Sequence, residues 1–211
     1  WGMLTINLST GEKKIYQCPW TKSIMRLRTI VPENDQKWWV RSFDQGVFVF
    51  NPKTFQFTHH YNVGQSSIGD KPPDANYLIR DKKGRIFEST NAGLYQYNDA
   101  RDTFLRVNPK GNFIFGASLM GMAEDKSGLI WIGTDKGLMA VKADSGKVVE
   151  SFTENNRIGL VQRISVDGDQ NVWFNSIAGY WCWLRNRGKI IQFKYSLGLP
   201  YNDGGSFYRS E

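Results

Sequence analysis

Residues 125 to 138 read Asp125-Lys-Ser-Gly-Leu-Ile-Trp-Ile-Gly-Thr-Asp-Lys-Gly-Leu138, and the rest of the chain repeats this pattern. Asp81–Leu94 and Asp167–Tyr180 align with it without a gap, and Glu33–Val47 aligns with one extra residue. The repeats are anchored by glycines at spacings of 44, 47, 44 and 42 residues: Gly2, Gly46, Gly93, Gly137 and Gly179. A period of about 40 to 50 residues is typical of β-propeller blades.

Each repeat divides into four strand-like pieces. The turn Asp125-Lys-Ser-Gly128 has Asp first and Gly fourth, as a type I turn prefers, and it joins a first strand to a second strand at Leu129–Gly133. Further strands are expected at Leu138–Val141 and Val148–Phe152. We therefore predict an all-β fold of propeller blades, each a four-stranded antiparallel sheet. A single segment, 1–211, would hold four complete repeats and two partial ones: 1–20 (partial), 24–61, 76–107, 118–153, 161–196 and 203–211 (partial).

The composition agrees with sheet. Aromatic residues make up 14% of the chain, and such side chains suit a pleated, half-buried surface. No apolar run reaches the roughly 18 residues of a membrane span. The chain opens at Trp1 without a signal peptide, which indicates a segment of something longer. Cys18 and Cys182 fit no metal or redox spacing, so we expect two separately buried thiols rather than one bridge.

The formal charge of +7 does not indicate a nucleic-acid partner, because Lys and Arg are scattered and no recognition motif is present. One group of basic residues falls in the turns between strands one and two or three and four, which share one face of a propeller. We expect these residues to serve solubility, or docking onto a neighbouring domain or anionic material. They are Lys82, Lys83, Arg85, Lys126, Lys147, Arg185, Arg187 and Lys189.

The stretch Asp125–Leu138 resembles the two-component regulator propeller repeat throughout, and Ser196–Asn202 resembles the segment that introduces the next blade in that family. The other repeats are degenerate, with Phe87 in place of Trp and Gln170 or Gln36 in place of the turn Gly. The resemblance implies the periplasmic sensor region of a hybrid histidine kinase, cut from a larger, seven-bladed propeller. Such receptors detect products of polysaccharide breakdown.

Ligand contacts are expected on the face that carries the loops between second and third strands and the crossovers between blades. Hydroxyl-rich ligands need planar polar groups and aromatic platforms. The ligand-binding candidates are Trp1, Trp20, Asp44, Gln45, Asn91, Asp135, Lys136, Arg157, Tyr201 and Asn202. The longest crossover, residues 64–74, is a candidate lid or interface loop.

Three other clusters are assigned structural roles, and no metal or cofactor is expected. The aromatic run Tyr180–Trp183 occupies core positions of the repeat. Asp167–Asn171 alternates oxygen side chains as calcium loops do, but it lacks the bidentate Glu and coincides with the repeat's turn. The pair His59-His60 points to opposite faces of a strand, and we expect it to face solvent.

The function predicted is a non-catalytic ligand sensor that binds an oligosaccharide and shifts the population of a receptor dimer. Its partners would be the remaining blades and the downstream signalling domains, and its location the periplasm. One alternative is a propeller glycoside hydrolase or polysaccharide lyase; hydrolysis needs two carboxylates roughly 5 to 10 Å apart, and the loops offer only Asp44, Asp135 and Asp203. Another is a protein-binding scaffold.

The two ends of the chain do not complete one blade. The N-terminal piece supplies third and fourth strands, Met3–Leu8 and Lys14–Cys18, whereas Ser206–Arg209 supplies only a first strand. We therefore expect an open arc rather than a closed five-bladed ring. Such an arc exposes apolar surface built for burial, which favours association. At the N-terminal end the residues expected to be exposed are one of two same-face pairs of the strand, Met3/Thr5 or Leu4/Ile6.

Overall fold

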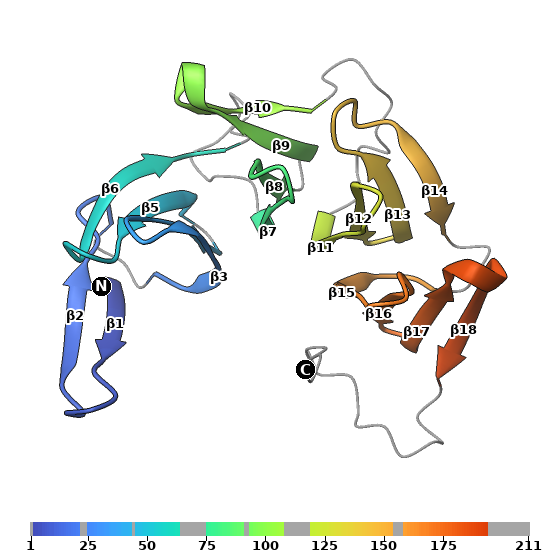
Figure 1. Cartoon of the computed structure of the whole chain (residues 1–211), viewed down its shortest axis with the longest axis horizontal. Helices are drawn as coiled ribbons and strands as arrows, with labels where there is room; N and C mark the ends of the chain where they lie inside the picture. Colours follow the sequence, from blue (N-terminus) through green and yellow to red (C-terminus); the bar gives the residue numbers. More distant parts are fainter. Residues whose placement is uncertain are drawn as a thin grey trace.

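The computed structural model describes residues 2–21, 25–43, 45–63, 75–90, 93–107, 119–153 and 158–193. Within these ranges the chain forms four four-stranded sheets and one two-stranded sheet, all antiparallel. Figure 1 shows the sheets following one another around an arc, with β3, β7, β11 and β15 on its inner side. The predicted all-β fold of propeller blades is confirmed.

The strands of each sheet pair in chain order. Blade 1 contains β3 (Leu27–Asn34), β4 (Lys37–Ser42), β5 (Val47–Asn51) and β6 (Gln56–Tyr61). Blade 2 contains β7 (Ala75–Arg80), β8 (Ile86–Thr90), β9 (Gly93–Asn98) and β10 (Thr103–Arg106). Blade 3 contains β11 (Leu119–Glu124), β12 (Leu129–Thr134), β13 (Gly137–Lys142) and β14 (Val148–Phe152). Blade 4 contains β15 (Val161–Val166), β16 (Val172–Ser176), β17 (Gly179–Leu184) and β18 (Lys189–Phe193). The outer hairpin contains β1 (Gly2–Ile6) and β2 (Lys13–Gln17).

The anchoring glycines each begin a third strand where the fourth strand runs close beside it. Gly46 has φ +92° and Gly137 has φ +142°, a backbone region that residues other than glycine rarely adopt. A Cβ atom at Gly46 would overlap the carbonyl oxygen of Tyr61, and one at Gly137 would overlap that of Phe152. Backbone conformation and close approach together explain why glycine recurs at this position.

The turn between third and fourth strands contains a second left-handed position, which glycine does not always occupy. Gly146 and Gly188 hold it in blades 3 and 4, with φ of +63° and +54°. Phe55 holds it in blade 1 with φ +58°, and Asp102 in blade 2 with φ +47°. A bulky residue in this region is strained. At Phe55 the strain accompanies a contact, because its ring stacks on Tyr16 at 4.6 Å.

The core consists of layers between neighbouring blades rather than one central cluster. Trp39 of blade 1 packs against Leu78 and Phe104 of blade 2, and Trp131 of blade 3 packs against Phe174 of blade 4. The sheets of blades 1, 2 and 3 are therefore covered on both sides, which explains the buried residues at successive positions of β5 and β13. Trp181 is 5% exposed and lies in the layer between blades 3 and 4, so its predicted core role is confirmed.

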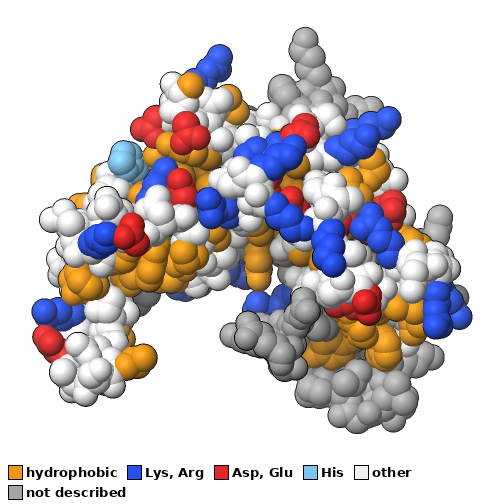
Figure 2. Space-filling view, viewed as in Figure 1, with side chains coloured by type: hydrophobic (Ala, Val, Ile, Leu, Met, Phe, Trp, Pro, Cys, Tyr) orange, Lys and Arg blue, Asp and Glu red, His pale blue; other side chains and the backbone are white. Residues whose placement is uncertain are grey.

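The two ends of the described arc remain open. β1 and β2 pair only with each other among the described strands. Leu4 is 54% exposed and Ile6 49%, so Leu4/Ile6 is the column left uncovered, while Met3 is buried against blade 1. Figure 2 shows hydrophobic side chains on the surface of this hairpin. Residues 203–211 lie outside the described part of the chain.

The cysteine prediction is confirmed: Cys18 and Cys182 are free and buried. Burial raises the pKa of Cys182 to about 12. No helix within the described ranges is long and apolar enough to cross a membrane.

Candidate functional site

A blade presents two faces at the ends of its strands. We name the end with the loops between second and third strands the loop face, and the end with the turns between strands one and two and strands three and four the turn face. Four ligand-binding candidates lie in the described residues, all near the loop face: Trp20, Gln45, Asp135 and Lys136. Six candidates lie outside the described residues, as does the crossover 64–74: Trp1, Asp44, Asn91, Arg157, Tyr201 and Asn202.

The structure brings Trp20 and Gln45 together through His60. The rings of Trp20 and His60 lie 5.9 Å apart, and His60 Nε2 donates to the Gln45 carbonyl oxygen at 2.5 Å. His60 also stacks on Phe48, with ring centroids 4.4 Å apart. The expectation that His60 faces solvent is therefore wrong, because His60 on β6 pairs directly with Phe48 on β5 and its ring packs on that neighbour. Trp20 is 45% exposed and forms an aromatic platform at this rim.

The same loop carries a second cluster on its other side. Phe43 follows β4 directly, and its N–H donates to the Arg26 carbonyl oxygen at 2.8 Å. The guanidinium carbons of Arg26 and Arg28 lie 4.6 and 4.5 Å from the centroid of the Phe43 ring. Cation–π attraction of this kind holds both groups against one ring. The sequence reasoning missed these residues; their signal was two arginines two positions apart at the start of a first strand.

Asp135 and Lys136 lie on the loop of blade 3, separated from this group by blade 2. Both are exposed, and the Lys136 backbone N–H donates to Thr134 Oγ1 at 3.1 Å. The described candidates are thus split between two blades, and the group on blade 1 is the denser one. We call the group around residues 43–46 the blade 1 site: Trp20, Arg26, Arg28, Phe43, Gln45 and His60.

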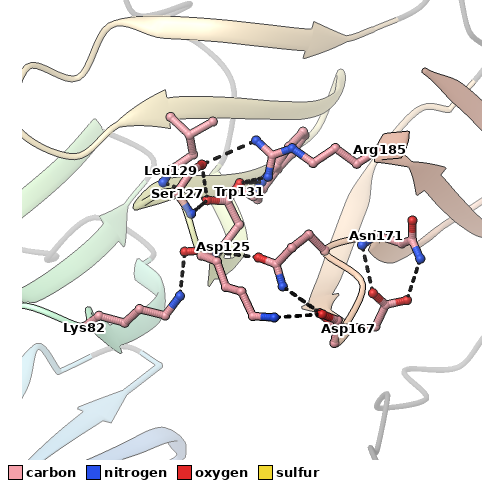
Figure 3. A network of polar contacts seen from close by, with 11 residues as sticks. Lys82, Asp125, Ser127, Leu129, Trp131, Asp167, Asn171 and Arg185 are labelled. Atoms are coloured by element: carbon pink, nitrogen blue, oxygen red, sulfur yellow. Dashed lines mark hydrogen bonds and ion pairs between the residues drawn. The ribbon is translucent and has the colours of Figure 1, made fainter. Parts of the chain in front are cut away.

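The recurrent acids of the repeat are held on the turn face by their own blades. Asp125 Oδ1 accepts from the backbone N–H groups of Ser127 and Leu129 at 2.8 and 3.1 Å, and Oδ2 accepts from Trp131 Nε1 at 3.0 Å. Figure 3 shows these donors converging on the carboxylate. Burial opposes ionisation of Asp125, but hydrogen bonds from Ser127, Trp131 and Arg185 outweigh it and lower its pKa.

The same contact recurs in other blades, which confirms that Trp131 and Trp173 are equivalent. Trp173 Nε1 donates to Asp167 Oδ2 at 2.8 Å, and Trp39 Nε1 donates to Glu33 Oε2 at 2.7 Å. Trp173 is only half-buried, because no described blade covers the outer side of blade 4. Asp167 is engaged as a turn residue, and no group of three metal-ligating side chains occurs in the described ranges.

Several basic residues of the turn face link neighbouring blades, a role that sequence reasoning missed. Arg185 of blade 4 bonds to Asp125 of blade 3 at 2.5 Å. Lys82 of blade 2 donates from Nζ to the Asp125 carbonyl oxygen at 2.8 Å, and Lys126 reaches Gly168 at 3.0 Å. Figure 2 shows Lys and Arg interspersed with Asp and Glu over the middle of the arc. These cations serve blade packing, beyond the solubility or docking that was predicted.

One buried ion pair was not foreseen from the sequence. Arg41 Nε of blade 1 lies 2.7 Å from Glu88 Oε1 of blade 2, with side chains 1% and 0% exposed. Burial raises the pKa of Glu88 to about 8, and Arg41 opposes this shift. The signal lay in the repeat. The position of Glu88 is apolar in the other blades, where it is held by Val40, Ile132 and Phe174, so a carboxylate there breaks the pattern.

The fold is shared with solved propellers. The extracellular domain of BT4673 from B. thetaiotaomicron, described as a hybrid two-component system, matches with a TM-score of 0.70 and 17% identity over 92% of this chain and 25% of that chain. That of BT3049 from the same organism matches with a TM-score of 0.65 and 18% identity over 91% and 26%. Virginiamycin B lyase from Staphylococcus aureus, solved with quinupristin, matches with a TM-score of 0.62 and 16% identity over 82% and 57%.

The likeness establishes the propeller fold, and it confirms at that level the resemblance to two-component regulator propeller repeats. The chain spans about a quarter of the length of the two extracellular domains. No protein-family model and no curated protein sequence matches the chain.

Proposed function

We propose that this chain is the ligand-sensing, non-catalytic propeller region of an extracytoplasmic two-component receptor, and that it binds an oligosaccharide at the blade 1 site. The observation that carries the proposal is the contrast between the two faces. The recurrent carboxylates Asp125 and Asp167 are held by backbone and indole donors on the turn face. The half-exposed ring of Trp20 and the polar groups of Gln45 lie on the other face.

Trp20 supplies the apolar platform that a sugar ring requires. Gln45 is linked to it by His60, whose ring contacts Trp20 and whose Nε2 bonds to the Gln45 carbonyl oxygen. Aromatic side chains bury large area while polar neighbours fix orientation. The hydrogen bond from His60 to the Gln45 carbonyl and its stacking on Phe48 hold the rim in place. Such preorganisation reduces the entropy that binding must overcome.

The receptor mechanism is a population shift. A glycan that prefers one arrangement of the sensor over another biases the receptor dimer by its difference in affinity for the two. Periplasmic location, a homodimer, the remaining blades and the downstream signalling domains are parts of this proposal. The sensor likeness of BT4673 and BT3049 supports it through the shared fold.

The test is a thermal-shift screen of the protein against a panel of oligosaccharides, with Trp20→Ala as the matched variant. We expect stabilisation by a subset of glycans, lost in the variant, with unchanged unfolding of the free proteins. Each glycan that binds is then incubated with the protein and assayed for new reducing ends and unsaturated products. Product formation would favour a glycoside hydrolase or lyase, and stabilisation by no glycan would favour a protein-binding scaffold.

A further inference from the structure

Three side-chain oxygen atoms meet where blades 1 and 2 pack together. Tyr61, the last residue of β6, donates from its hydroxyl to Asp102 Oδ1 at 2.6 Å, and Tyr97 of β9 donates to the same oxygen at 2.7 Å. The two hydroxyls also hydrogen-bond to each other. Each oxygen therefore lies close to the other two, and the group is open to solvent because Asp102 is exposed.

The spacing of these atoms matches one face of a metal coordination octahedron. A small octahedral cation holds oxygen ligands about 2.0 Å away, which places neighbouring ligand atoms about 2.8 Å apart. The two separations from Asp102 Oδ1, 2.6 and 2.7 Å, are close to that value. The described ranges hold no metal-binding group of three His, Cys, Asp or Glu side chains. This group differs from such sites because phenols supply two of its three oxygens.

The protonation of the phenols determines which cation fits. Burial and the neighbouring carboxylate raise the pKa of Tyr61 and Tyr97, so both hydroxyls are protonated in the metal-free protein. A metal ion must displace both protons in order to bind phenolates. Mg²⁺ and Ca²⁺ take carboxylates, carbonyls and water, whereas a tyrosine oxygen is an established ligand of iron. A hard trivalent ion carries the charge that this displacement requires.

The surroundings of the carboxylate favour such a role. Asp102 has φ +47°, in the left-handed position that Gly146 and Gly188 occupy in blades 3 and 4. Side chains held in this region store strain, and such residues cluster at binding sites. Lys37 Nζ lies 5.2 Å from the ring centroid of Tyr97 and adds positive charge that stabilises a phenolate.

We propose that Tyr61, Tyr97 and Asp102 form a binding site for a ferric ion, held by two phenolates and one carboxylate. One Fe³⁺ enters and two protons leave, and no electron is transferred. Water or a small chelating anion fills the remaining positions of the ion. Because Tyr61 belongs to blade 1 and the other two residues to blade 2, the ion joins the two blades. The sequence did not reveal this site, since Tyr61 and Asp102 are 41 residues apart.

The experiment is titration of the protein at neutral pH with ferric nitrilotriacetate, which keeps the ion in solution. We expect one ion per chain and a visible phenolate-to-iron charge-transfer band, which ferric nitrilotriacetate alone does not give. Ultraviolet difference spectra should show two ionised tyrosines per bound ion. The ion should also raise Tm, because a ligand that binds only the folded state stabilises it. An excess of Mg²⁺ or Ca²⁺ should not displace it.

Three variants test the ligands: Tyr61→Phe, Tyr97→Phe and Asp102→Asn. Each should lower ferric affinity by more than about ten-fold, the loss that even an outer-shell substitution causes. Asp102→Asn keeps an acceptor for both phenols, so it remains a test if a Phe variant fails to fold by circular dichroism. Tyr77→Phe is the matched control and should bind as wild type, because Tyr77 packs in the layer between blades 2 and 3.

Iron bound without the visible band, or a band that survives in both Tyr61→Phe and Tyr97→Phe, would overturn the site. Absence of binding, or an equal loss in Tyr77→Phe, would overturn it as well. Mg²⁺ or Ca²⁺ bound as tightly as iron, and lost in Asp102→Asn, would show a carboxylate site for divalent ions and contradict the ferric assignment.

Discussion

Replacing Asp125 by Ala should destabilise the protein more than any change to the other repeat acids. The carboxylate is fully buried and accepts from the Leu129 backbone and the Trp131 indole, which the substitution leaves without an acceptor. Each buried donor left unpaired costs about 1 to 3 kcal/mol. Arg185 adds less, because its side chain is 29% exposed. The free energy of unfolding should therefore fall by about 3 to 5 kcal/mol.

The measurement is thermal unfolding followed by circular dichroism. For a chain of this size each kcal/mol lowers Tm by about 2 to 4 °C, so Asp125→Ala should lower Tm by about 10 °C. Asp125→Asn should lower Tm by roughly half as much, because the asparagine amide oxygen still accepts hydrogen bonds while the amide NH₂ group faces the Arg185 donors. Asp169→Asn is the control, since Asp169 is exposed. A loss in Asp125→Ala no larger than in this control would refute the reasoning.

Acid titration gives the same prediction a second readout. The folded-state pKa of Asp125 is lowered, so its contribution is present above the unfolded value near 3.9 and is lost as pH falls through the folded value. The stability gap between wild type and Asp125→Asn should therefore shrink below about pH 4. A gap that stayed constant down to acid pH would show that the carboxylate's charge plays no part.

Three further outcomes are expected. Arg41→Met alone should cost about 3 to 5 kcal/mol in urea unfolding, because it leaves the buried Glu88 carboxyl without its partner, whereas Arg41→Met with Glu88→Leu should cost little; equal losses would contradict this. Phe55→Gly should be about 1 kcal/mol more stable than Phe55→Ala, since only glycine relieves the positive φ; equal stabilities would show the turn to be unstrained. Cys18 and Cys182 should react with a thiol reagent only after unfolding, and a disulfide found by mass spectrometry would contradict the two free thiols.

The repeat made the fold predictable from the sequence. An acidic residue six positions before an aromatic residue marks the turn between the first and second strands. The glycine that follows marks the start of the third strand. The structure adds the physical reason: Asp125 accepts from both the turn backbone and Trp131. Burial of both faces of β5 and β13 follows from blade stacking, which the repeat itself implies.

The site was predictable only in part, because a repeat alignment places loops but does not show which side chains meet. Trp20 and Gln45 were expected on one face, yet their contact runs through His60, whose ring stacks on its cross-strand neighbour Phe48 of β5. The pairing of Arg41 with Glu88 joins two blades across 47 residues of sequence. Neither contact can be inferred from spacing within one repeat. Glu88 nevertheless departs visibly from the repeat pattern, because it places a carboxylate at the position that Ile132 occupies in blade 3.

The most direct test of the account is amide hydrogen exchange of the protein with and without the glycan that binds it best. We predict slower exchange in residues 17–21 and 43–46, on the loop face of blade 1. Exchange in the turn-face segments 81–85 and 125–129 should stay unchanged. Protection confined to the turn face, with residues 43–46 unaffected, would contradict the account.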